Sequence, residues 1–128
     1  MIVAGIGCRK GASRADVLAA IAAAVEAAAI DPGSVDLIAT AAEKGGEDGI
    51  AEAAAVLGRP LVLIPSDRLQ AAGSRAVTHS DRVVALFAVP SVAEASALAA
   101  AGVDSALIVP RRVAGAATCA LAEQKGPF

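Results

Sequence analysis

The chain has no tryptophan and no tyrosine, and only two phenylalanines among its 128 residues. A core without large aromatic side chains has to be built from Ala, Val, Leu and Ile, which favours close packing of helices on a sheet. The same lack removes the stacking residues on which nucleic-acid-binding proteins rely, and the formal net charge of −2 offers no basic surface in their place. The sequence therefore argues against a general nucleic-acid binder, and any anion site has to be local.

Cysteine and histidine are equally scarce. Cys8 and Cys119 lie far apart and neither belongs to a C-x-x-C pair, which argues against a zinc site. His79 is the single histidine, so a His-based catalytic triad has no choice of base. No apolar run approaches the roughly 18 residues of a membrane helix, and the first apolar stretch precedes its cations, the reverse of a secretory signal. We therefore expect a cytoplasmic protein with reduced thiols and no membrane contact.

The residues that are present alternate between short apolar runs and alanine-rich stretches. The apolar runs predict buried strands at 1–8, 35–40, 61–65, 105–110 and 116–124. Apolar residues at helical spacing predict helices at 14–29, 47–57, 66–73 and 91–101. The third of these helices is expected to take its N-cap from Ser66 or Asp67. The run at 82–89 fits either type, because its β-branched residues favour a strand while Ser80 and Asp81 are good helix caps.

Two helix starts carry a serine followed three residues later by an acid. These capping boxes are Ser13 with Asp16, and Ser91 with Glu94. In each box the serine hydroxyl accepts a hydrogen bond from a free backbone N–H of the first turn, and the acid reaches back toward the serine. This role explains Glu94 without any further function.

Strands alternate with helices through the first half of the chain, which is typical of a mostly parallel sheet covered by helices on both faces. We therefore expect a single α/β domain over residues 1–128, with three layers in the order α/β/α. In such sheets, ligands bind beyond the carboxyl ends of the strands. The loops expected at that edge are 8–13, 40–47, 66, 74–80 and 110–118.

The stretch GIGCRKGAS at 5–13 places three glycines and two cations in a turn before a helix. It is not a dinucleotide-binding fingerprint, because Lys10 stands where the third glycine belongs and Gly11 comes one residue late. The second strand also ends at Thr40 without the acid that would bind a ribose. Two interpretations stay open: an anion site at a helix N-terminus, where Arg9 could bind a carboxylate, or a tight structural turn.

Three residues are candidates for catalysis. Cys8 suits a nucleophile, since a nearby cation and a helix N-terminus would lower the pKa of its thiol, but a small buried residue at a strand end is the commoner case. Lys44 and Glu47 suit an acid–base pair, or else a loop charge and a carboxylate at a helix start. Arg111 and Arg112 follow a strand end, where they would meet either a ligand or water.

A set of motifs runs in order along nearly the whole chain: GIGCRKGAS (5–13), LIATAAEKGGEDGI (37–50), LVLIPSDRL (61–69), THSDRV (78–83), PSVAEASALAAAG (90–102) and LIVPRRVAGAATCALA (107–122). Together they resemble the family formed by CobE and the C-terminal domain of CbiG, both of cobalamin biosynthesis. Two departures concern the site. Ala12 stands where the family usually has threonine, and Arg111 and Arg112 stand near a position that is often lysine.

The resemblance implies a role in making the corrin ring. CbiG-like proteins open a lactone on a cobalt-precorrin and release acetaldehyde, whereas CobE-like proteins stand alone, as this chain does, and act in the aerobic branch. The resemblance therefore implies a CobE-like protein that binds or carries a precorrin or hydrogenobyrinic-acid-type tetrapyrrole. The alternative that it leaves open is a CbiG-like hydrolase, which opens the lactone of a cobalt-precorrin.

Such tetrapyrroles carry a rim of acetate and propionate carboxylates, which need scattered cations and backbone N–H groups. The residues expected to bind them are glycines and polar residues of the loops named above: Gly7, Cys8, Arg9, Gly11, Ser13, Thr40, Lys44, Ser66, Thr78, Ser80, Arg111 and Thr118. For hydrolysis, the candidates are Cys8 as nucleophile, or Lys44 and Glu47 as acid and base. No metal or cofactor is expected, and contacts with other corrin-pathway enzymes or a homodimer stay open.

Overall fold

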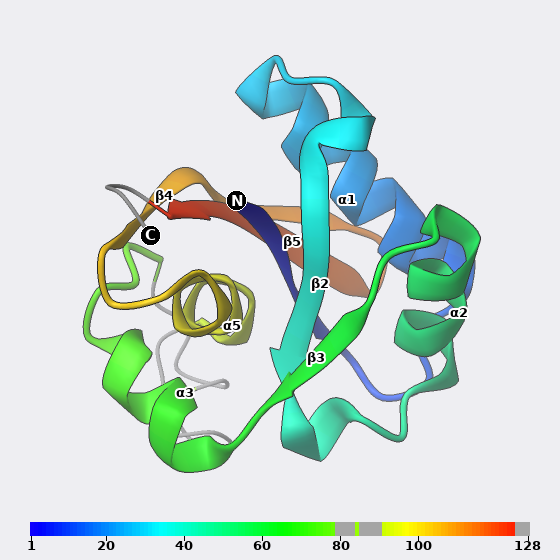
Figure 1. Ribbon diagram of the computed structural model, residues 1–128. Helices are drawn as coiled ribbons and strands as arrows, with labels where there is room; N and C mark the ends of the chain where they lie inside the picture. Colours follow the sequence, from blue (N-terminus) through cyan, green and yellow to red (C-terminus); the bar gives the residue numbers. More distant parts are fainter. Residues whose placement is uncertain (79–83, 85–90, 125–128) are drawn as a thin grey trace.

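The computed structural model describes residues 1–78, 84 and 91–124 (Figure 1). Its strands are β1 (Ile2–Cys8), β2 (Val35–Ala41), β3 (Leu61–Ile64), β4 (Ser105–Ala114) and β5 (Ala117–Gln124). Its helices are α1 (Arg14–Ala28), α2 (Asp48–Leu57), α3 (Ser66–Gly73) and α5 (Val92–Ala101), with short 3₁₀ turns η1 (Pro32–Ser34) and η2 (Ala42–Lys44). The run at 82–89, whose type the sequence left open, lies outside the described residues apart from Val84.

The predicted α/β class is confirmed, but the sheet is mixed rather than mostly parallel. Its strand order is β3-β2-β1-β5-β4. β1 pairs with β2 and β2 with β3 in parallel, whereas β5 is antiparallel to both β1 and β4. The reason is the turn between β4 and β5, where Gly115 has φ +56° and the chain reverses within two residues. A connection this short can join only antiparallel strands.

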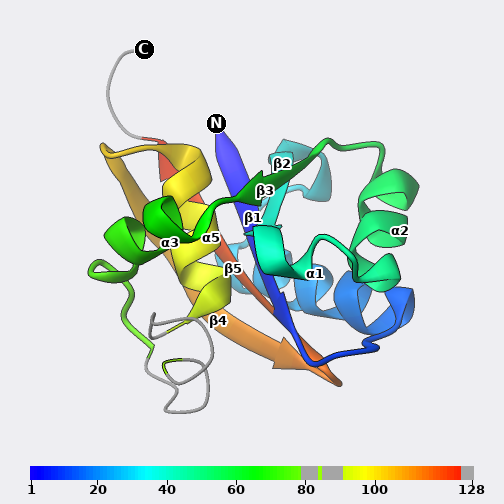
Figure 2. The same ribbon diagram turned by 90° about the horizontal axis from the view of Figure 1, so that it is seen from below.

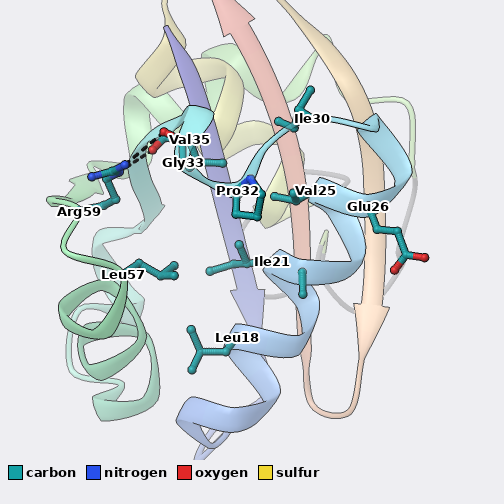
Figure 3. A pocket seen from close by; sticks show the side chains of 11 residues that line it. Leu18, Ile21, Val25, Glu26, Ile30, Pro32, Gly33, Val35, Leu57 and Arg59 are labelled. Carbon is teal, nitrogen blue, oxygen red and sulfur yellow. Dashed lines mark hydrogen bonds between the residues drawn. The ribbon is translucent and has the colours of Figure 1, made fainter.

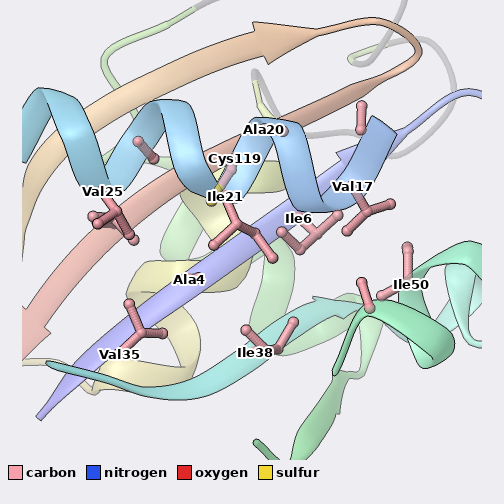
Figure 4. Close-up of a cluster of buried hydrophobic side chains, with 14 of the residues drawn as sticks. Ala4, Ile6, Val17, Ala20, Ile21, Val25, Val35, Ile38, Ile50 and Cys119 are labelled. Atoms are coloured by element: carbon pink, nitrogen blue, oxygen red, sulfur yellow. The ribbon is translucent and has the colours of Figure 1, made fainter. Parts of the chain in front are cut away.

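Helices cover both faces of the sheet, as Figures 1 and 2 show, with α1 and α2 on one face and α3 and α5 on the other. On the first face, Val17 and Ile21 of α1 are buried over Ile6 of β1 (Figure 4). Together with the buried side chains of β2 and β5, they form one of two core clusters. The second cluster lies on the other face, where Leu69 of α3 and Leu98 of α5 are buried. We call these the α1 side and the α5 side.

Helix α5 lies directly on β1. A Cβ atom on Gly5 would clash with the backbone oxygen of Ala93 and the backbone nitrogen of Ala97. Only glycine in the strand and alanine in the helix allow this close approach, which is why a core without large side chains still closes on this face. None of the described helices is both long and apolar enough to cross a membrane.

The strand ends lie at two opposite edges of the sheet, which we call the carboxyl edge and the amino edge after the direction of β1. β1, β2, β3 and β4 run in the same direction, and Cys8 at the end of β1 is paired with Ala117 at the start of β5. Helices α1, α2 and α5 begin at this carboxyl edge, with Gly49 of α2 packed against the backbone oxygen of Ala12. At the opposite, amino edge, Ile2 is paired with Glu123, and Gln124 N donates to Met1 O at 3.0 Å.

One predicted helix start is wrong. Pro65 is the N-cap of α3, no side chain caps it, and Ser66 is already the first helical residue. Neither Ser66 nor Asp67 therefore caps α3. A proline is favoured next to a helix start because it has no N–H to leave unsatisfied and its φ is already fixed near the helical value.

Candidate functional site at the carboxyl edge of the sheet

The turn after β1 is held by hydrogen bonds from its own backbone. Gly11 has φ +79°, a conformation that favours glycine, and Ala12 N donates to Arg9 O at 3.1 Å. Arg9 N donates to Ala116 O at 2.9 Å in the turn between β4 and β5. Gly11 N donates to the Glu47 carboxylate at 2.8 Å. The turn therefore does bind an anion, and that anion is the Glu47 carboxylate of the same chain.

Cys8, Lys44 and Glu47 lie close enough to influence one another, and with Gly11 we call them the turn cluster. Burial raises the pKa of the Cys8 thiol, the charge of Lys44 partly opposes this rise, and the charge of Glu47 adds to it. The expected lowering of the pKa of Cys8 is therefore wrong in direction. The prediction failed because the desolvation of a half-buried thiol outweighs the attraction of one cation. The thiol stays protonated at neutral pH.

Several hydroxyl groups of the predicted site are used within the fold. Thr40 Oγ1, which is fully buried, donates to Ile6 O at 2.7 Å and thereby joins β2 to β1. Thr118 Oγ1 donates to Gly7 O at 3.1 Å. Ser13 Oγ accepts from Asp16 N at 3.0 Å, as the capping box predicts. The Asp16 carboxylate does not complete that box: it accepts from Ala116 N at 3.3 Å in the β4–β5 turn.

Glu94 is the most heavily hydrogen-bonded carboxylate among the described residues. It is fully buried in the first turn of α5, where Ser91 Oγ accepts from its backbone N–H at 3.3 Å, as predicted. Its Oε1 accepts from Val77 N at 2.7 Å and Thr78 N at 2.8 Å. Its Oε2 accepts from Thr78 Oγ1 at 2.5 Å and Arg111 N at 2.9 Å. Glu94 thus joins three segments, which a helix-capping role alone does not explain.

These hydrogen bonds also decide the charge of Glu94. Burial raises the pKa of its carboxyl group, but the hydrogen bonds from Arg111, Thr78 and Val77 outweigh burial and leave the pKa lowered. The carboxylate is therefore negative at neutral pH although no solvent reaches it.

Arg111 donates its backbone N–H to Glu94 because β4 is irregular at that point. Val109 is paired with Leu121 and Arg112 with Cys119, so β4 has one residue more than β5 between these pairs. The irregularity includes Pro110, which has no N–H for the ladder and is tolerated because β4 is an edge strand. Such bulges redirect side chains and are frequent beside functional sites.

The side chain of Arg111 is in an unusual state. Its Nε is buried, and no hydrogen-bond partner reaches it within the described part of the chain. Arg112, the next residue, is exposed. We call Thr78, Glu94, Pro110 and Arg111 the bulge cluster. The sequence prediction included Thr78 and Arg111 but missed Glu94. The available signal was Pro110: a proline inside an apolar strand indicates an irregularity, and at this irregularity the N–H of Arg111 is donated to Glu94.

The predicted residues thus form two groups at one edge rather than a single cluster. Cys8 packs against the α1-side core, whereas the bulge cluster is anchored on α5. Arg9, in the β1–α1 turn, and Ser66, the first residue of α3, are both exposed, and Ser80 lies outside the described residues. No group of three or more His, Cys, Asp or Glu that could hold a metal is found in the described ranges.

Within the described part of the chain, cavities lie away from these two clusters. A groove of about 480 Å³ lies between α1 and the end of α2 (Figure 3). Leu18, Ile21 and Val25 line it, and Arg59 at its rim donates to Val35 O at 2.7 Å. A smaller cavity of about 300 Å³ lies between α3 and α5. None of the predicted site residues lines either cavity.

Comparison with known proteins agrees with this fold. Protein CobE from a Sinorhizobium species is 33% identical over 121 residues, which cover 94% of this chain and 79% of that protein. A crystal structure of CobE, described as a protein from the cobalamin (vitamin B12) biosynthetic pathway, matches with a TM-score of 0.92 and 28% identity, covering 100% of this chain and 93% of the other. The cobalamin biosynthesis protein chiG from Agrobacterium tumefaciens str. C58 matches with a TM-score of 0.77 and 39% identity, over 98% and 100% of the two chains.

The family model described as "Cobalamin synthesis G C-terminus" matches residues 2–122. This range includes both the turn cluster and the bulge cluster, and it agrees with the resemblance carried by the sequence motifs. The chain therefore belongs to the CobE and CbiG C-terminal family and is a CobE-like protein of cobalamin biosynthesis.

Proposed function

We propose that this protein binds or carries a tetrapyrrole intermediate of cobalamin biosynthesis, of the precorrin or hydrogenobyrinic-acid type, at the carboxyl edge of its sheet. The observation that carries the proposal is the buried Nε of Arg111, which lacks a partner among the described residues. Native proteins pair most of their buried polar groups, so a buried donor without an acceptor suggests a ligand that supplies one. The family membership suggests which ligand that is.

The charge distribution supports a ligand with several carboxylates. The chain as a whole is slightly acidic, yet Arg9, Lys44 and Arg111 all lie on segments at the carboxyl edge. Each charge-assisted hydrogen bond to a carboxylate contributes about 1.5–3 kcal/mol. A few such bonds, together with contacts to the ring, are sufficient for micromolar affinity after the cost of association.

Binding is favoured over hydrolysis by the state of the catalytic candidates. The raised pKa of Cys8 keeps its thiol protonated, whereas a nucleophile needs the thiolate. Glu47 accepts a hydrogen bond from Gly11 N, so its carboxylate is already engaged in holding the turn. A CbiG-like lactone hydrolase would therefore have to work with a protonated Cys8 thiol and with a Glu47 carboxylate that already accepts a hydrogen bond.

The test is a titration of the purified protein with hydrogenobyrinic acid, followed by visible absorption. We expect saturable spectral shifts at micromolar concentration and co-elution of pigment and protein in gel filtration, which also reports whether the protein is a homodimer. Absence of any spectral change at high micromolar concentration would contradict the proposal. A separate incubation with a lactone-bearing cobalt-precorrin, followed by mass spectrometry of the recovered pigment, distinguishes binding from catalysis, because a ring with an opened lactone differs in mass from the starting ring.

A further inference from the structure

At the bulge in β4, the side chain of Arg111 has a hydrogen-bond donor, Nε, without an acceptor among the described residues. Pro110 interrupts the ladder, and the backbone N–H of Arg111 is donated to Glu94 at 2.9 Å instead of to a neighbouring strand. The backbone of Arg111 is therefore fixed by a buried carboxylate. Its side chain has a buried Nε.

Glu94 does not neutralise this side chain through a hydrogen bond. A carboxylate offers about four acceptor positions, and those of Glu94 are filled by two N–H groups on Oε1 and by a hydroxyl and an N–H on Oε2. No salt bridge involving Arg111 is found among the described residues. The Nε–H of Arg111 is therefore a buried donor without an acceptor in this part of the chain.

We propose that Arg111 is the residue that recognises a free carboxylate of the bound tetrapyrrole and makes the site prefer the acid to its ester or amide. The inference rests on the proposed function. A guanidinium presents Nε–H and a neighbouring Nη–H side by side, which matches the two oxygens of a carboxylate. A methyl ester has no negative charge and only one carbonyl acceptor. A protein with this preference acts before the reactions that amidate the carboxylates of the ring.

Arg112 provides a matched control. It is the next residue, it carries the same charge, and it is exposed. It is paired with Cys119, whose side chain belongs to the α1-side core, and residues directly opposite each other in a sheet share a face. Replacing Arg112 therefore removes the same charge from the other side of the strand.

The experiment compares two ligands and four proteins. Dicyanocobyrinic acid and its heptamethyl ester have the same ring, metal and axial ligands and differ in their carboxylates. Visible titration gives the dissociation constant of each for the wild type, Arg111→Ala, Arg111→Lys and Arg112→Ala. We expect Arg111→Ala to lose roughly 10- to 100-fold affinity for the acid and less than about 3-fold for the ester. Arg111→Lys should recover only part of the loss, and Arg112→Ala should change either constant by less than about 3-fold.

Four results would overturn the inference. Equal losses in Arg111→Ala and Arg112→Ala would mean that general charge, not this side chain, attracts the acid. Equal losses for acid and ester in Arg111→Ala would mean that Arg111 supports the site without contacting a carboxylate. If the wild type binds neither ring, the proposed function fails and the inference fails with it. Binding of both rings with no dependence on Arg111 removes the inference alone.

Discussion

The turn cluster and the bulge cluster have similar chemistry but differ in what they leave unused. Each places a carboxylate and a cation beside the carboxyl edge of the sheet. In the turn cluster, Glu47 binds the backbone of the β1–α1 turn and Lys44 acts on the thiol of Cys8. In the bulge cluster, Glu94 is saturated by donors other than the guanidinium, and a buried N–H of Arg111 has no acceptor in the described chain.

This difference shows that residue types alone do not identify a ligand site. The glycine-rich turn has the composition of an anion site, and its anion is Glu47. The strand with Pro110 and Arg111 contains no glycine-rich turn, yet it holds the unused donor. What separates the two is the list of hydrogen-bond partners, which only the folded chain reveals.

The largest expected effect is on stability, and it concerns Glu94. Glu94→Gln replaces an acceptor oxygen by an N–H₂ group that faces N–H or O–H donors, so buried donors lose their partner. We expect a loss of about 3 kcal/mol in the free energy of unfolding, measured by urea denaturation. Glu47→Gln is the control from the turn cluster: glutamine can still accept from Gly11 N, so its loss should stay near 1 kcal/mol. Equal losses would remove the distinction between the clusters.

The second effect is the dependence of stability on pH. Folding lowers the pKa of Glu94 from its ordinary value of 4.5, so its stabilisation is fully present above that value. It is lost as the pH falls through the lower pKa of the folded state. Urea denaturation from pH 7 to pH 3 should show the difference between the wild type and Glu94→Gln shrinking on the acid side. A difference that stays constant over this range would contradict the lowered pKa.

The smallest effect has the opposite sign. Arg111→Met keeps an unbranched stem and removes a buried donor that lacks a partner, so the free energy of unfolding should stay unchanged or rise by up to about 1 kcal/mol. Arg112→Met, at an exposed position, should stay within about 0.5 kcal/mol of the wild type. A clear loss of stability in Arg111→Met would indicate a structural role and weaken its assignment to a ligand.

Local features were predictable from the sequence. The serine caps at Ser13 and Ser91 depend on neighbouring residues, and both are present. The direction of β5 was not predictable, because it depends on the two-residue turn at Gly115 and on pairing with β1 across more than a hundred residues. The contact between Glu94 and Arg111 spans 17 residues and depends on the bulge in β4. The capping-box pattern that identified Glu94 in the sequence does not predict such a bulge. The raised pKa of Cys8 depends on burial, which sequence patterns do not give.

The hydrogen bond between Gln124 and Met1 has a practical consequence for engineering. Both residues stand at the amino edge, and the seven residues of β1 separate that edge from Cys8 by about 20 Å. A fluorophore or tethered enzyme attached at Met1 would thus sit away from the surface where a pigment is expected to dock. Energy transfer from such a fluorophore to a bound pigment would quench its emission and so report binding. The fluorophore would not contact the residues that are expected to bind the pigment.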